Sequence, residues 1–183
     1  MIRRYISLRT PSIMCDSVLK LSIVDLRGCY LLIDVDNTLC LRQSEAVDVE
    51  VVQFLRQLRT DGVVHGICLV SNVVTRSKRR IERVARIADQ LDCEFVCAHW
   101  PRIKPKPHPY REALAKLGNV DPRDAVMIGD QLFTDILGAN RLGMRTALVR
   151  PLGQDSFITR PRRVWEGLIV KLRRLYNITS PPH

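Results

Sequence analysis

Aromatic side chains are scarce in this sequence, where Phe, Trp and Tyr make up 5% of the residues. They do not alternate with the arginines, so the sequence gives little support to single-strand nucleic-acid binding, in which bases stack on aromatic rings. Long apolar runs are also lacking, since none approaches the roughly 20 residues of a membrane-spanning helix. These two absences favour a globular protein without a transmembrane segment.

Regular cysteine spacing is absent as well. The six cysteines lie mostly in apolar, strand-like segments, where a free thiol behaves as a small hydrophobe. Residues 1–15 contain Arg, Ser and Thr but no acidic residue and no continuous apolar core, which is typical of an organelle transit peptide and not of a secretion signal. We therefore expect a reducing compartment, either the cytoplasm or an organelle interior (mitochondrion or plastid).

Positive charge is the unusual bulk property of the 183-residue chain, whose formal net charge is +10. Arginines cluster at 76–86 and at 160–174. Such clusters fit an anionic partner, namely a membrane surface, a nucleic acid or a phosphorylated substrate. They are equally consistent with solvated helix faces, and the sequence leaves both interpretations open.

Short apolar segments alternate with helical patterns along the chain. Strands are expected at 28–36, 63–72, 93–100, 125–130 and 145–151, and helices at 47–62, 75–91, 110–117 and 134–143. This alternation predicts an α/β fold with a parallel sheet of about five strands and helices on both faces. We expect one domain over 1–183, with a lead segment at 1–27 and a basic amphipathic tail at 157–183.

Polar clusters follow four of these strands. They are Asp34, Asp36 and Thr38 after the first strand, Ser71 and Asn72 at the end of the second, Lys104 after the third, and Asp130 and Asp135 after the fourth. Ligands of parallel sheets bind at the carboxyl ends of strands, so these side chains are expected to converge.

Two carboxylates as close together as Asp34 and Asp36 are costly to bury unless a cation compensates them. Mg²⁺ binds one or two carboxylates together with phosphate oxygens and water, so the pattern predicts a magnesium site for a phosphate ester. One aspartate would then act as nucleophile on phosphorus, and the other would transfer protons. Ser71 and Lys104 would supply donors for phosphoryl oxygens.

These motifs resemble those of the haloacid dehalogenase (HAD) superfamily, and within it the YqeG-type class IIIA phosphatases. The resemblance rests on IDVDNTL (33–39), VSN (70–72), KP (104–105), the stretch 128–152 and FITR (157–160). It implies a Rossmann-like fold and a Mg²⁺-dependent phosphatase. In its implied catalytic roles, Asp34 is the nucleophile and a metal ligand, and Asp36 is the general acid/base, with a metal-binding main-chain carbonyl. Thr38, which also supports the first loop, Ser71, Asn72 and the motif lysine Lys104 are the expected phosphate-binding residues, and Ser71 and Lys104 also take part in catalysis. Asp130 is a further metal ligand and Asp135 an outer-shell acid. Lys106 remains an alternative to Lys104, although the helix start at Tyr110 favours Lys104.

A cap domain is not expected, because residues 39–70 and 73–103 each have room for only one helix and one strand. An open site suits a large or surface-presented substrate, and relatives of the family include phosphatidylglycerophosphate phosphatases. The alternatives are a soluble phosphatase of nucleotides, phosphoproteins or nucleic-acid ends, and a non-catalytic RNA- or ribosome-binding protein. An amphipathic tail helix over 160–176, with Val164, Trp165, Leu168, Ile169 and Leu172 on one face, could lie on an anionic membrane or pack against the sheet.

Overall fold

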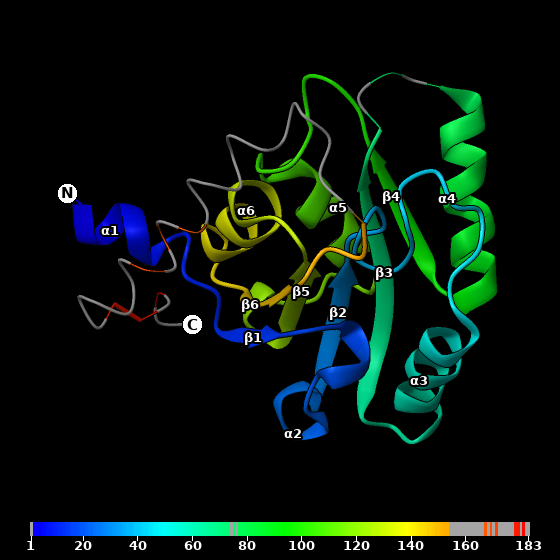
Figure 1. Ribbon diagram of the computed structural model, residues 1–183, viewed down its shortest axis with the longest axis horizontal. Coiled ribbons are helices and arrows are strands. Elements are labelled where there is room, and N and C mark those ends of the chain that lie inside the picture. The colour runs from blue at the N-terminus through cyan, green and yellow to red at the C-terminus, as the bar shows by residue number, and fades with distance from the viewer. Residues whose placement is uncertain are drawn as a thin grey trace.

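Six strands form one parallel sheet in the order β1-β6-β5-β2-β3-β4 (Figure 1). The structure is a computed structural model and describes residues 2–73, 75, 77–153, 167, 169, 171, 178–179 and 181. The strands are β1 (Ile13–Cys15), β2 (Cys29–Ile33), β3 (Val64–Asn72), β4 (Glu94–Ala98), β5 (Ala125–Gly129) and β6 (Arg145–Val149). The helices are α1 (Ile2–Ser7), α2 (Ile23–Leu26), α3 (Val49–Thr60), α4 (Lys78–Leu91), α5 (His108–Lys116) and α6 (Leu137–Asn140).

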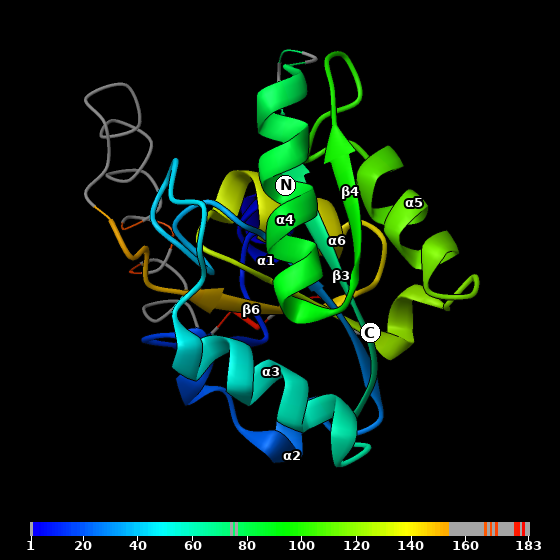
Figure 2. The ribbon, with the colours of Figure 1, turned by 90° about the vertical axis from the view of Figure 1, so that its right-hand side faces the viewer.

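Helices cover both faces of the sheet, as the alternating pattern predicts (Figure 2). In β2, Leu31 and Ile33 belong to the core that includes residues of α3 and α4. Leu32, between them, belongs to the second core, which includes residues of α5 and α6. Successive side chains of a strand point to opposite faces, so a run of buried apolar residues serves both layers.

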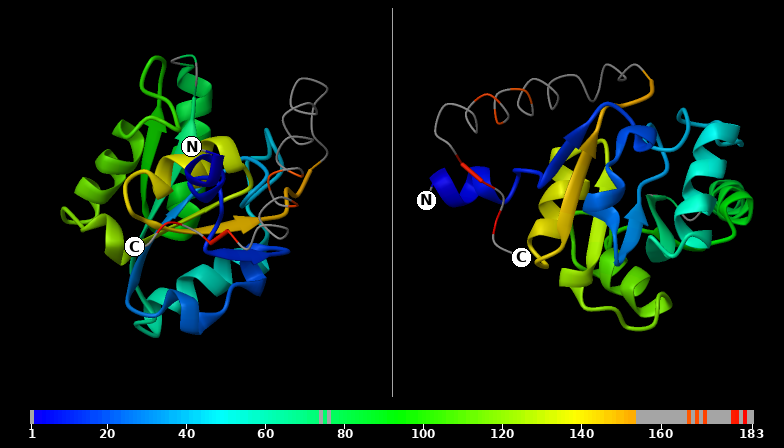
Figure 3. Two further views of the ribbon diagram at one scale, coloured as in Figure 1. Left: turned by 90° about the vertical axis from the view of Figure 1, so that its left-hand side faces the viewer. Right: turned by 90° about the horizontal axis from the view of Figure 1, so that it is seen from below.

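The sheet has six strands, one more than the five whose positions the sequence indicates. Residues 13–15, expected to be part of a lead segment, form β1 and pair in parallel with β6 at the edge of the sheet. The lead segment also contains α1, α2 and a short 3₁₀ turn at Val18–Lys20. Figure 3 shows α1 next to the sheet edge formed by β1 and β6.

The expected helix at 134–143 takes a different form in the structure. A π-helical segment, Leu132–Ile136, leads into the short α6, so the chain after β5 begins with wider turns than an α-helix. π-Helical turns occur often at functional sites, because they change the direction in which side chains point. Here the segment contains Asp135.

Most of the predicted tail helix lies outside the described residues, including Val164, Trp165, Leu168 and Leu172. Of the tail residues that the structure describes, Gly167, Ile169 and Lys171 are helical. Ile169 is buried in a small cluster with Ile6, Leu132 and Ile136. At this position the apolar stripe therefore packs against the body of the protein. Over the described ranges, no helix combines the length and the apolar character that crossing a bilayer requires.

Candidate active site

The polar residues predicted from sequence meet at the carboxyl edge of the sheet. Asp34 follows β2, Ser71 lies near the end of β3, Lys104 follows β4 and Asp130 follows β5. These four strands are neighbours in the order β5-β2-β3-β4, so their ends lie side by side (Figure 1). Because β2 and β5 are neighbours in the sheet, Asp34 and Asp130 lie close together although about a hundred residues separate them in the sequence.

Lys104 is the cation at the centre of this cluster. Its Nζ lies 2.5 Å from Asp34 Oδ1 and 2.7 Å from Asp135 Oδ1, and donates to the main-chain oxygen of Val70 at 2.7 Å. Burial opposes the charged form of Lys104, but the carboxylates of Asp135 and Asp34 outweigh it and raise the pKa of the amine. Lys106, the alternative, is exposed beside the ring of Trp100. Lys104 is therefore the lysine that reaches the carboxylates.

Three buried carboxylates surround a position suitable for a cation. Asp34, Asp130 and Asp135 each offer an oxygen within 4.8 Å of the others, and all three residues are at most 6% exposed. Burial raises the pKa of Asp34, Lys104 opposes this rise, and Asp135 and Asp130 add to it. One lysine cannot balance three carboxylates, so a divalent cation would favour their ionised forms. The oxygen-only donor set fits Mg²⁺.

Gly129, the last residue of β5, makes the position of Asp135 possible. A Cβ on Gly129 would lie 2.5 Å from Asp135 Cγ, closer than real carbon contacts. The main-chain N–H of Gln131 donates to Asp135 Oδ2 at 3.2 Å and fixes the carboxylate further. Asp135, which is expected from its motif to be an outer-shell acid, lies beside Asp34 and Asp130 in the structure.

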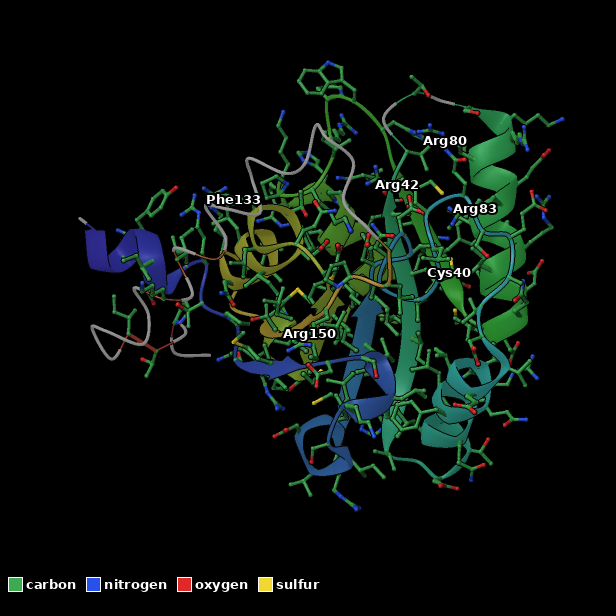
Figure 4. All side chains as sticks on the ribbon, in the orientation of Figure 1. Cys40, Arg42, Arg80, Arg83, Phe133 and Arg150 are labelled. Carbon is green, nitrogen blue, oxygen red and sulfur yellow. The ribbon has the colours of Figure 1, made fainter. Side chains whose placement is uncertain are left out.

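Asp36 is not a member of the carboxylate cluster and pairs with an arginine instead. Its Oδ1 pairs with Arg83 Nη1 of α4 at 2.9 Å, and the side chain is 29% exposed. Arg83 Nε also donates to the main-chain oxygen of Ser44 at 2.5 Å, so this arginine connects Asp36 and the loop after it to α4. Figure 4 shows Arg83 between α4 and the loop that carries Cys40. In the sequence, Arg83 stands out only as part of a basic cluster, because spacing alone does not indicate which arginine of a helix faces a site.

Three further polar residues lie at the carboxyl edge of the sheet, and each makes a different contact. They are Thr38, Ser71 and Asn72. Thr38 Oγ1 donates to Asp34 Oδ2 at 3.4 Å, in keeping with support of the first loop. Ser71 is buried and lines the adjoining cavity. The Asn72 side chain bonds to the main chain of Lys104 in both directions, accepting from its N–H at 2.9 Å and donating to its carbonyl at 3.4 Å. Asn72 therefore holds the segment that carries Lys104.

A cavity of about 1030 Å³ opens in front of these residues. Asp36, Ser71 and Lys104 form part of its wall, and apolar side chains such as Ile103 and Phe133 form another part. Its basic wall is formed by Arg42, Arg79, Arg80 and Arg83. The volume is in the range of pockets that bind whole organic ligands, so it accommodates more than a phosphoryl group.

Comparisons with known proteins agree with this geometry. A family model for HAD-hydrolase-like proteins matches residues 102–153. A Bacillus subtilis protein described as probable phosphatase YqeG is 30% identical over 150 residues, which cover 81% of this chain and 80% of that protein. A glyceraldehyde 3-phosphate phosphatase of Pyrococcus abyssi is 51% identical over 95 residues, but these cover only 50% of this chain and 37% of that enzyme.

A solved structure supports the fold. A crystal structure of an uncharacterized protein from Listeria monocytogenes serotype 4b aligns with a TM-score of 0.52, at 19% identity, over 78% of this chain and 99% of that chain. The parallel sheet and the sequence relatives together define a phosphatase of the HAD type. Within this class, the chain belongs to the family of YqeG phosphatases.

Proposed function

We propose that this phosphatase hydrolyses phosphomonoesters with Mg²⁺ and forms a phosphoryl-enzyme intermediate on Asp34. The observation that carries the proposal is the buried Asp34 carboxylate, which Lys104 holds at 2.5 Å beside Asp130 and Asp135. A carboxylate nucleophile needs its ionised form and a fixed direction, and a hydrogen-bonded lysine helps to supply both.

In the first step, an oxygen of Asp34 attacks phosphorus and the bond from phosphorus to the alcohol oxygen breaks. Asp36, whose carboxyl lies at the cavity wall, gives a proton to the departing oxygen. In the second step, Asp36 takes a proton from water as the water oxygen attacks phosphorus. The acyl phosphate bond then breaks and returns Asp34 to a carboxylate.

The remaining residues bind and orient the phosphoryl group. Ser71 and Lys104 line the cavity, and we assign them to donate to the phosphoryl oxygens, where negative charge accumulates. Asp34, Asp130 and the main-chain carbonyl of Asp36 would hold Mg²⁺, and Asp135 lies close enough to contribute a third carboxylate. The ion would neutralise phosphoryl charge when bound.

Phosphatidylglycerophosphate is the substrate that we favour. The wide cavity, its arginines, its apolar wall and the net charge of +10 support a phosphate presented at an anionic surface. The second candidate is a small soluble phosphoester, because a relative over half of the chain is a glyceraldehyde 3-phosphate phosphatase.

Hydrolysis of p-nitrophenyl phosphate with Mg²⁺ tests the chemistry. Asp34→Asn is expected to lose about 10³-fold or more in kcat, because an amide is a far weaker nucleophile than a carboxylate. Asp124→Asn, which changes an exposed acid after α5, is the matched control and should retain activity. Full activity in Asp34→Asn would refute the assigned nucleophile.

Magnesium binding has a readout that does not depend on turnover. Mg²⁺ should raise the Tm of the wild-type chain above its value in EDTA, because a ligand that binds only the folded state stabilises it. Asp130→Asn should remove most of this increase, whereas Asp124→Asn should keep it. An equal increase in all three proteins would place the ion elsewhere.

Phosphate release from vesicles that contain phosphatidylglycerophosphate tests the favoured substrate. We expect kcat/KM for this lipid to exceed the values for glyceraldehyde 3-phosphate and nucleoside monophosphates. Equal or faster turnover of the soluble compounds would assign the second candidate function.

A further inference from the structure

The cavity in front of the candidate active site has a strongly basic end. Three of its arginines, Arg79, Arg80 and Arg83, come from the first half of α4, and Arg42 comes from the loop after β2. Figure 4 shows Arg42, Arg80 and Arg83 gathered where this loop faces α4. The same cavity reaches Ser71 and Lys104, so one ligand can contact both ends.

The acidic residues of this wall are already matched with other arginines. Asp36 pairs with Arg83 at 2.9 Å, and Glu45 pairs with Arg86 at 3.1 Å. Over the ranges that the structure describes, no carboxylate lies within ion-pair distance of Arg42, Arg79 or Arg80. These three guanidinium groups therefore give the cavity an excess of positive charge.

Such a grouping of like charges is unfavourable in the free protein. Arg79 and Arg80 repel each other and Arg42. They also follow directly after the residue at which α4 begins, where the helix dipole favours negative side chains. An anion bound in the cavity would reverse both effects, and guanidinium groups bind phosphate through paired hydrogen bonds.

We propose that Arg42, Arg79 and Arg80 form a second anion subsite, which binds a phosphate mono- or diester that the enzyme does not cleave. The substrate class is then a phosphomonoester that carries a second phosphate group on the same molecule. This inference rests on the proposed function at Asp34 and specifies its substrate. Apolar wall residues such as Val73, Ile103 and Phe133 suit a hydrocarbon linker between the two groups.

The subsite is tested by comparing the hydrolysis of alkane-diol bisphosphates of increasing chain length, which have two phosphates, with that of p-nitrophenyl phosphate, which has one. In the variant Arg79→Ala/Arg80→Ala, kcat/KM for the best bisphosphate should fall about 10- to 100-fold more than kcat/KM for p-nitrophenyl phosphate, the loss typical of removing charge-assisted hydrogen bonds. Phosphatidylglycerophosphate in vesicles is the second arm. A larger fall in kcat/KM for either the bisphosphate or the lipid than for p-nitrophenyl phosphate supports the subsite. The substrate with the larger fall shows whether the subsite binds a soluble bisphosphate or a lipid headgroup.

Lys78→Ala is the matched control, because Lys78 lies in the same turn of α4, is exposed and is outside the cavity wall. It should keep kcat/KM for both kinds of substrate. The subsite would be overturned if kcat/KM for the bisphosphate fell as much in Lys78→Ala as in the arginine variant. It would also be overturned if the arginine variant lost kcat/KM equally for both kinds of substrate. Either result would mean that the positive surface attracts all anionic substrates without a specific site.

Binding of propane-1,3-bisphosphonate, measured by calorimetry with Mg²⁺, separates this inference from the catalytic proposal. The wild-type chain should bind it at least tenfold more tightly than methylphosphonate, and Arg79→Ala/Arg80→Ala should abolish the difference. That result supports the subsite even in a chain that hydrolyses nothing. Equal affinity of the wild-type chain for the two phosphonates would overturn the subsite even in an active enzyme.

Discussion

Lys104 is a buried cation among carboxylates, and its removal should be costly. In Lys104→Met the carboxylates of Asp34 and Asp135 lose the amine that lies 2.5 and 2.7 Å away. Breaking a buried ion pair from one side typically costs about 3–5 kcal/mol. We expect the free energy of unfolding in urea, measured in EDTA, to fall by that amount.

Lys106→Met provides the comparison at the same loop. Lys106 is exposed and near the ring of Trp100, so its replacement should change the free energy of unfolding by less than about 1 kcal/mol. Similar losses in the two variants would contradict the central position of Lys104.

Side-chain identity at the site follows from sequence more readily than side-chain direction does. Asp34, Ser71, Lys104 and Asp130 meet because each follows a strand of a parallel sheet, and that rule needs only the strand positions. The inward position of Asp135 depends on the missing side chain of Gly129 and on a π-helical segment. Neither feature has a periodic signature in the sequence.

At the scale of elements, α4 connects to the site through Arg83, which we assign to positioning Asp36. Replacement by Met should lower kcat about 10- to 100-fold for a poor leaving group such as an alkyl alcohol, because proton donation then limits the reaction. The loss should be smaller with p-nitrophenyl phosphate, whose leaving group needs little protonation. Arg83→Lys should recover part of the activity.

The leaving-group comparison separates this role from general damage to the fold. A misfolded fraction of Arg83→Met would reduce turnover of both substrates by the same factor. Such an equal reduction would exclude a positioning role. The exposed Arg56 of α3 is a suitable control, and Arg56→Met should show neither effect.

The contact between α5 and α6 depends on Gly138. A Cβ at this position would lie 2.3 Å from the hydroxyl oxygen of the buried Tyr110, which donates to the main-chain oxygen of Thr134 at 2.6 Å. We expect Gly138→Ala to lower the free energy of unfolding by about 1–3 kcal/mol through overpacking. In the Tyr110→Leu background the added cost should be smaller, because the hydroxyl oxygen and both ring carbons that lie within 2.6 Å of the added Cβ are gone. Additive costs in a double-mutant cycle would contradict this contact.

Elements with a strong pattern were predicted well, and short ones were not. The helix predicted at 47–62 and the strand predicted at 63–72 match α3 and β3 closely. Strand β1 has only three residues and none of them is fully buried, so it lacks the apolar run that marks the inner strands. Its place at the edge follows from pairing with β6, which is a tertiary contact.

At the scale of the whole molecule, the alternation of apolar strands and helices was sufficient to predict the α/β class and both helical layers. It could not specify the strand order β1-β6-β5-β2-β3-β4, which depends on how the crossovers pack. The amphipathic tail shows the same limit. Its apolar stripe fits either a membrane or the body of the protein. The structure shows that Ile169 packs against the body, in a cluster with Ile6, and the sequence pattern alone does not indicate this.

The net charge of +10 leads to a prediction about membranes. Each Lys or Arg near an anionic surface contributes about 1 kcal/mol, and salt screens this attraction within a Debye length. The chain should therefore sediment with vesicles that contain phosphatidylglycerol and remain in solution with pure phosphatidylcholine vesicles. Raising the salt to 0.5 M should release it.

Charge variants show which surface of the protein binds the vesicles. Arg162, Arg163, Arg173 and Arg174 belong to the basic cluster at 160–174, and changing all four to Gln should weaken vesicle binding by several kcal/mol if this cluster faces the lipid. A control with the same loss of charge combines Gln at the exposed Arg27, Arg56, Arg111 and Arg123, which lie on or beside different elements and outside the cavity wall. Equal weakening in both variants would mean that net charge alone, and not the tail, determines the attraction. A loss confined to the tail variant would instead show that the tail arginines face the bilayer while Ile169 holds the tail against the body of the enzyme.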